Sequence, residues 1–270
     1  MKLVIAATLA SAVTATFVRT PGGLVHESCI INAEDAAAAF NASAVSCPFA
    51  APAEERALEA SARPTQIYAM DTHTQKATFW TNFTANWVVP KLPAAKNGQV
   101  VYFWPGFKSS KPEMGLPVLQ PVMQYGQGLS RKWQLQSWFV HGGAVTAKAI
   151  ALEPGDEVTS IMSYDAASTT WTISGTNLNS GESSVLTITR AKLGGYDFDW
   201  AMLVCETIKD TGQCDSLPAD DAGLTFTNVT LDGNGLRFAP WIARHNLNDC
   251  NEAVTPNDAG DTVKMSWTYK

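Results

Sequence analysis

The chain has 270 residues, of which 19 are Lys or Arg and 25 are Asp or Glu, so only 16% are charged. Disordered tails, coiled coils and helical bundles need many charges, and the composition therefore disfavours all three. The formal net charge of -6 and the pI of about 5.2 disfavour nucleic acid or an anionic membrane as a partner. Nine Trp and 19 Gly, with many Thr, Val and Ser, favour an all-β protein.

The N-terminus has the pattern of a signal peptide. Lys2 precedes an apolar run over residues 3–10, and small residues follow as far as Ala15. This run is too short for a membrane span, which needs about 20 apolar residues. Cleavage after Ala15 or after Ala12 suits the small-residue rule, so we expect a signal peptide over residues 1–15 and a secreted, extracellular mature protein with no membrane partner. We also expect a monomer.

An exported chain can also carry glycans. Three Asn-x-Ser/Thr triplets begin at Asn41, Asn82 and Asn228, and each is a candidate for glycosylation, although such triplets also arise by chance.

The five cysteines follow the signal segment, so an even number of them should pair in an oxidising compartment. Cys29 and Cys47 are close in sequence and far from the rest, which favours a bridge between them. Cys205 lies inside an apolar strand, where a buried thiol is the ordinary state. We therefore expect the second bridge to join Cys214 and Cys250.

Residues 16–65 differ from the rest of the chain. They are rich in Ala, contain weakly helical stretches at 34–40 and 54–60, and have few large apolar side chains. Such a segment cannot build its own core, so it is either a propeptide or an N-terminal arm held to the main domain.

From residue 66 the sequence alternates with a period of two. The pattern is longest over residues 76–89, where Phe83, Ala85 and Trp87 share one face. Further strands are expected over residues 99–104, 118–125, 133–140, 145–152, 157–164, 169–174, 184–189, 198–206, 224–230 and 262–269. With turn signals and no helices between them, these strands predict an antiparallel β-sandwich over residues 66–270.

Familiar catalytic motifs are missing from the sequence. The histidines at 26, 73, 141 and 245 are far apart and lack the spacing of a metal site, and no GxSxG motif or phosphate-binding loop occurs. Gly126-Gln127-Gly128 lies between two expected strands and indicates a hairpin. We expect no metal and no cofactor.

Two polar residues interrupt apolar strands. Gln120 follows Val118-Leu119, and Glu206 ends a run of apolar residues that begins at Trp200. Glu206 either lies at a strand end in solvent or faces a cleft, where desolvation would raise its pKa toward a value useful for proton transfer. The alternation turns Glu206 to one face of its strand and Cys205 to the other.

The order of these segments resembles the eqolisin family of glutamic peptidases over residues 76–270. The resemblance is carried by Asn86-Trp87-Val88-Val89-Pro90, Val101-Tyr102-Phe103-Trp104-Pro105-Gly106, Val118-Leu119-Gln120, Glu153-Pro154-Gly155-Asp156, Ala201-Met202-Leu203-Val204-Cys205-Glu206 and Leu224-Thr225-Phe226-Thr227-Asn228. It implies a concanavalin-like or jelly-roll-like sandwich and a secreted acid endopeptidase that acts on polypeptides. Gln120 and Glu206 match the catalytic pair, and Trp104, Trp133 and Trp138 are candidates for lining the substrate groove.

Three departures from the family pattern concern residues around the pair. The acid of the family's aromatic segment "W-Y-E-W-Y-P" is missing from residues 133–140, where Gln136 or Trp138 could replace it. The Asp that follows "W-V-G" is missing after Trp104-Pro105-Gly106, and Met202 stands in place of the first Glu of "A-E-x-I-x-E". These changes put the activity or its pH optimum in doubt more than the fold.

The competing hypothesis is glycan binding. Concanavalin-like sandwiches also serve as lectins, and the Trp/Gln alternation over residues 133–138 would suit stacking on sugar rings. A polysaccharide-degrading enzyme would need two carboxylates, and only one is well placed.

Overall fold

The computed structural model describes thirteen ranges of the chain, namely 17–20, 23–26, 30–32, 65–71, 79–95, 98–109, 117–126, 131–141, 143–208, 214–219, 223–233, 241–245 and 250–268. The expected signal peptide, the weakly helical stretches, Asn41 and the expected bridge between Cys29 and Cys47 lie outside these ranges. In the described part no helix is long and apolar enough to cross a membrane.

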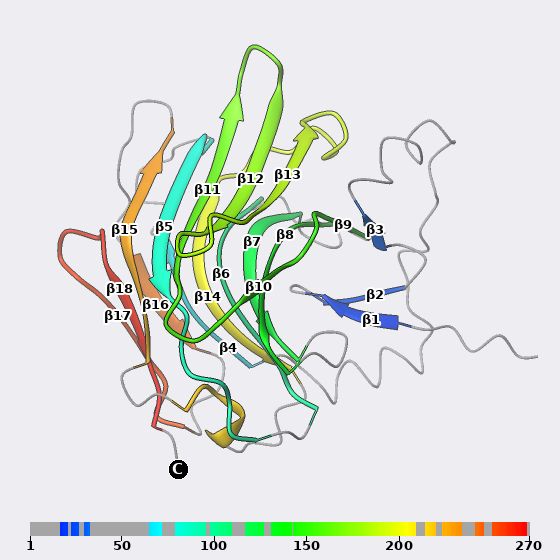
Figure 1. Cartoon of the computed structure of the whole chain (residues 1–270). Coiled ribbons are helices and arrows are strands. Elements are labelled where there is room, and N and C mark those ends of the chain that lie inside the picture. The colour runs from blue at the N-terminus through cyan, green and yellow to red at the C-terminus, as the bar shows by residue number, and fades with distance from the viewer. Residues whose placement is uncertain are drawn as a thin grey trace, which may run out of the picture.

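The described strands form two large sheets that face each other (Figure 1). The nine-stranded sheet has the order β16 (Trp241–His245), β4 (Thr65–Asp71), β14 (Trp200–Ile208), β6 (Val100–Lys108), β7 (Val118–Tyr125), β8 (Trp133–Val140), β9 (Ala144–Thr146) and β3 (Ile30–Asn32), and β10 (Ile150–Leu152) pairs with β8. The seven-stranded sheet has the order β13 (Ser183–Thr189), β12 (Thr170–Asn177), β11 (Glu157–Asp165), β5 (Asn82–Val88), β15 (Leu224–Asp232), β18 (Val263–Ser266) and β17 (Ala253–Pro256).

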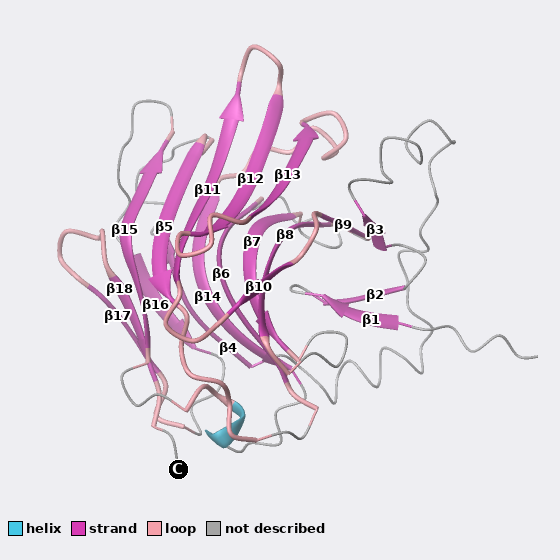
Figure 2. Cartoon of the chain, viewed as in Figure 1, coloured by secondary structure: helices cyan, strands magenta, loops and turns pink. Residues whose placement is uncertain are grey.

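Two further features complete the fold. β1 (Phe17–Thr20) and β2 (Gly23–His26) form a separate hairpin. Every described strand pair is antiparallel except β3 with β9. Figure 2 shows strands and loops with one short helical turn, η3 (Cys214–Ser216). The expected antiparallel β-sandwich is confirmed.

Most of the predicted strands occur, and β7 and β8 have the predicted bounds. The strand predicted over 76–89 begins only at Asn82. The strand predicted over 145–152 is two strands, β9 and β10, because residues 147–149 leave the sheet between them. The short strands β16 and β17 were not predicted, since four or five residues carry too little alternation to be recognised.

Aromatic side chains fill the space between the sheets. Trp171 of β12 is fully buried, and its ring lies 5.5 Å from that of Phe107 and 5.4 Å from that of Phe198. At Gly175 an added Cβ would come within 2.8 Å of the Leu135 side chain, so the glycine lets β12 approach β8 of the other sheet closely.

The cysteines confirm two expectations. Cys214 and Cys250 form a disulfide with their Cα atoms 5.4 Å apart. Cys205 is a buried thiol that packs with the core between the sheets. Its neighbour Glu206 must therefore face the opposite side of the nine-stranded sheet.

Candidate functional site

The nine-stranded sheet has a second buried face, turned away from the seven-stranded sheet. A separate apolar cluster covers it, with Tyr102 and Trp104 from β6, Val122 from β7, Trp138 from β8 and Val204 from β14 among its members. The long strands of this sheet curve strongly, with the concave side on this face (Figure 1). We call it the concave face.

Gln120 and Glu206 both lie on the concave face. Glu206 alternates with Cys205, which faces the core, and Gln120 pairs with Trp138, a member of the concave cluster. Both residues have an exposed fraction of 0%. The structure therefore excludes a solvent-exposed strand end for Glu206 and places the two expected residues on one face, covered in the full chain.

The register fixes how the two residues are offset. Glu206 lies opposite Tyr102, and Tyr102 lies opposite Gln124 of β7. Gln120 is four residues before Gln124 on the same strand. On a flat sheet this offset is about 13 Å along the strands and about 10 Å across them. The row that contains Trp104 and Val204 lies between. The two residues therefore share a face without being neighbours: their backbone positions are about 16 Å apart on a flat sheet, and Gln124 rather than Gln120 lies in the row of Glu206.

Two indoles lie beside the pair. Trp104 and Trp138 are 4% and 2% exposed, and in the described part of the chain neither Nε1 has a hydrogen-bond partner. The Trp104 ring lies over Gly106, where an added Cβ would approach Cζ3 to 2.7 Å. Both residues were expected near the site, and each offers a buried N–H donor there.

Two other expected lining residues have structural partners. Gln136 accepts a hydrogen bond from Nε2 of Gln124 at 3.1 Å and donates one to the carbonyl of Ala147 at 2.8 Å. The expectation that Trp133 lines the substrate groove is wrong. Trp133 lies in the core between the sheets, and its Nε1 donates a hydrogen bond to the carbonyl of Pro90 at 3.0 Å. Its odd position on β8 turns it away from the concave face.

Lys108 introduces a positive charge that the sequence analysis did not single out. Burial lowers the pKa of Lys108 below its ordinary value, and the negative charge of Glu206 partly offsets this effect. Lys108 shares the parity of Tyr102 and Trp104 on β6, so period two was the signal that could have found it. The electrostatic coupling links Lys108 to the expected catalytic carboxylate.

The departures from the family pattern have visible consequences. Met202 pairs with Gly106 and contributes to the apolar cluster of the concave face. Gln124, next to Tyr102 in the row of Glu206, is 2% exposed. The surroundings of Glu206 thus combine apolar side chains with neutral amides and one lysine.

The two described glycosylation candidates differ in accessibility. Asn228 is exposed on β15, with a φ of 50°. Asn82 is half-buried, and its Oδ1 is buried. Asn228 is therefore the more accessible acceptor.

Comparisons with known proteins agree with the fold. The sequence model of the Peptidase A4 family matches residues 70–239. A solved structure of scytalido-glutamic peptidase with a peptide-based transition state analog is similar, with a TM-score of 0.55 and 12% identity over 77% of this chain and 100% of that one. SCP-B, an eqolisin bound to the tripeptide Ala-Ile-His, gives a TM-score of 0.53, 12% identity and the same coverage. The curated proteins contain no match.

Proposed function

Because the chain belongs to the Peptidase A4 family, the eqolisin family of peptidase hydrolases, we propose that it is a secreted acid endopeptidase of the glutamic type. Its substrates would be polypeptides, and Gln120 and Glu206 would perform the hydrolysis. The observation that carries the proposal is the location of this amide and this carboxylate on one curved, apolar face of a single sheet. Glycan binding through residues 133–138 is disfavoured, since Trp133 lies in the core between the sheets and only Trp138 is on the concave face.

The proposed reaction is acid–base hydrolysis without a covalent intermediate. Ionised Glu206 takes a proton from a water molecule, and that water attacks the carbonyl carbon of the scissile peptide bond. The side-chain amide of Gln120 donates a hydrogen bond to the oxyanion that forms, which requires the curvature of the sheet to bring Gln120 and Glu206 to the same peptide group across the row of Trp104 and Val204. Glu206 then returns the proton to the leaving nitrogen, so that one carboxylate serves as base and then as acid.

The surroundings support these roles in different ways. Apolar neighbours such as Val204 exclude water and strengthen hydrogen bonds to the developing oxyanion. The positive charge of Lys108 favours the ionised form of Glu206, which the first step requires. The indole N–H groups of Trp104 and Trp138 are suited to donate to carbonyl oxygens of the substrate backbone.

We further propose that residues 16–65 act as a propeptide or covering arm. Substrate cannot reach Gln120 and Glu206 while both are fully buried. The segment contributes β3, which pairs with β9 at the edge of the same sheet. N-terminal sequencing of active, secreted protein tests this role: a start well after Ala15 supports removal, whereas fully active protein that starts at residue 16 supports a retained arm.

Cleavage of a denatured protein at acidic pH tests the catalytic pair. Glu206→Gln and Gln120→Ala should each lower kcat by at least about 100-fold, because each removes a group that acts in the transition state. Glu182→Gln, an exposed change in the turn before β13, is the matched control and should retain full activity. Chelators and inhibitors of serine and aspartic peptidases should leave the rate unchanged. Wild-type cleavage by either pair variant would refute the assignment.

A further inference from the structure

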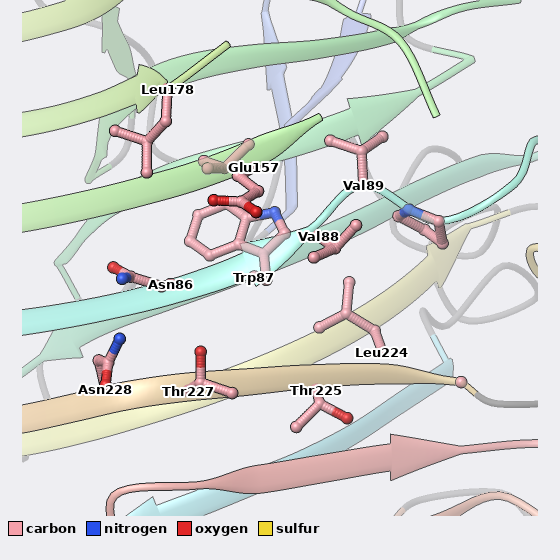
Figure 3. Close-up of a pocket in the computed structure, with 13 residues that line it drawn as sticks. Asn86, Trp87, Val88, Val89, Glu157, Leu178, Leu224, Thr225, Thr227 and Asn228 are labelled. Carbon is pink, nitrogen blue, oxygen red and sulfur yellow. The ribbon is translucent and has the colours of Figure 1, made fainter. Parts of the chain in front are cut away.

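A groove of about 440 Å³ lies on the seven-stranded sheet, where β5 and β15 diverge (Figure 3). Its walls include Asn86 and Val88 of β5, Glu157 of β11 and Thr225 of β15. No described residue of the nine-stranded sheet lines it. The groove is therefore separate from the concave face and from the proposed catalytic pair.

The two walls are strand edges that face each other without pairing. Toward the groove, the last described pair between β5 and β15 is Asn86 with Thr227. Beyond it β15 pairs with β18, through Thr225 and Lys264, and β5 pairs only with β11. The strands thus leave a wedge-shaped opening between them, visible in Figure 3.

Backbone groups of β5 point into this opening. The amide of Val89 bonds to the carbonyl of Asp156 at 2.8 Å, and its carbonyl accepts from the amide of Gly155 at 2.9 Å, both on the side of β11. Since successive residues of a strand direct their N–H and C=O groups to opposite neighbours, those of Val88 point toward β15. In register Thr225 would be the partner of Val88, and no such pair occurs among the described residues.

Side chains around the opening combine three kinds of chemistry. Val88 and Leu178 are 55% and 50% exposed, which is unusual for large apolar residues in this chain. The exposed carboxylate of Glu157 makes no ion pair in the described part of the protein. Asn86 and Asn228 lie at the closed end of the wedge (Figure 3), where Oδ1 of Asn86 accepts a hydrogen bond from the hydroxyl of Thr159 at 2.8 Å.

We propose that this groove binds an extended peptide segment that carries a basic side chain and, two residues before and after it, apolar side chains on the same face of the strand. The peptide backbone would pair with the open groups of Val88, as in binding by β-strand addition. Glu157 would bind the Lys or Arg, and Val88 and Leu178 would pack against the apolar side chains. A saccharide fits less well, because Trp87, the aromatic residue of the groove, is 2% exposed and offers no stacking surface.

Fluorescence anisotropy with the labelled, end-blocked peptide Val-Thr-Lys-Thr-Val, in which Lys and both Val share one face, tests the groove. The protein is the full chain with Glu206→Gln, so that binding is measured without cleavage and does not depend on the proposed activity. We expect saturable binding that Glu157→Lys weakens by at least about tenfold. Glu182→Lys makes the same charge change at an exposed position near β13 and should leave the affinity unchanged.

A second pair of variants and a second peptide test the other contacts. Val88→Asp should weaken binding about tenfold, whereas Val185→Asp, at a residue of similar exposure (50%) on β13, should not. The peptide Val-Pro-Lys-Pro-Val keeps the three side chains of that face, lacks two backbone donors and should bind at least about tenfold more weakly. Thermal unfolding of each variant confirms that it is folded, and Glu157→Gln provides a milder change at the same position.

Three results would overturn the proposal. They are the absence of saturable binding, equal weakening by Glu157→Lys and Glu182→Lys, and displacement of the peptide by cellohexaose or chitohexaose with an affinity that depends on Glu157. Intact peptide binding together with wild-type cleavage by the Glu206→Gln variant would refute only the catalytic assignment. Intact cleavage without peptide binding would refute only the groove.

Discussion

The two outward faces of the sandwich place similar polar side chains in opposite environments. On the seven-stranded sheet, hydroxyl and amide groups bond across neighbouring strands at the surface, as in Thr176 with Ser183 at 2.8 Å and Thr159 with Asn86 at 2.8 Å. On the concave face, Gln120 and Glu206 are fully buried among apolar residues. The outer polar groups cost little, because water or a neighbouring strand satisfies them, whereas each buried group carries a desolvation cost.

This difference indicates what each face is for. A fold that needed only stability could fill the concave face with apolar side chains alone. Polar groups that are kept there despite their cost are what a site for a polar ligand requires, and this agrees with the proposed peptidase chemistry. On the outer face the proposed peptide site lies where β5 and β15 separate.

The largest expected effect separates the inner and outer faces of the seven-stranded sheet. Trp171→Ala removes a fully buried side chain that contacts both Phe107 and Phe198, and should lower the free energy of unfolding by about 3–5 kcal/mol. Val185→Ala, on the outer face, should change it by less than about 0.5 kcal/mol. Urea unfolding measures both. Similar losses at the two positions would contradict the assignment of faces.

Next in size is the disulfide between Cys214 and Cys250, which are separated by 36 residues. Its removal in the double variant Cys214→Ser/Cys250→Ser should lower the free energy of unfolding by about 3–4 kcal/mol, mainly through the greater freedom of the unfolded chain. Urea unfolding measures the loss.

Cys205 should react with an alkylating agent only after denaturation, because it is buried in the core. Differential alkylation with peptide mapping gives the check, and labelling of Cys205 in the native protein would contradict the facing of β14.

A smaller effect compares two buried tryptophans. Trp133→Phe and Trp104→Phe remove similar apolar volume, but only Trp133 donates a hydrogen bond within the described structure, to Pro90. Trp133→Phe should therefore cost about 1 kcal/mol more stability. Trp104→Phe should instead raise KM for peptide cleavage, if its N–H binds substrate. Equal stability losses together with an unchanged KM would show that the concave face is not arranged for a ligand.

Alternation made most of the sheet predictable from the sequence. Long strands such as β7 and β8 repeat it over eight residues, and their bounds were predicted correctly. β9 and β10 were merged, because Ala147-Lys148-Ala149 between them continues the alternation and contains no turn residue. The order of strands in each sheet depends on contacts between distant segments, which a periodic pattern does not encode.

The candidate site was predictable in part. Gln120 and Glu206 stood out because polar residues interrupt apolar runs, and the alternation correctly separated Glu206 from Cys205. Trp133 and Trp138 are five positions apart, so the alternation requires them to face opposite sides of β8. The prediction nevertheless placed both of them at the groove. The groove between β5 and β15 could not be predicted, since it arises where two strands lose their register.

The smallest expected effect concerns Lys108. Burial lowers its pKa in the folded protein, so between that pKa and the ordinary value of 10.5 the unfolded chain binds more protons than the folded one. Stability should therefore rise with pH through this window and be lowest below it, where folding retains a buried charge.

Lys108→Met keeps the apolar stem, so it should raise the free energy of unfolding below the window and abolish the rise within it. Lys264→Met, at an exposed position of β18, should change neither. Urea unfolding from acidic to alkaline pH distinguishes the two, and an unchanged pH profile in Lys108→Met would show that this lysine is not desolvated. Because Glu206 would lose a positive neighbour, the same variant should also move the acidic limb of the cleavage rate to higher pH.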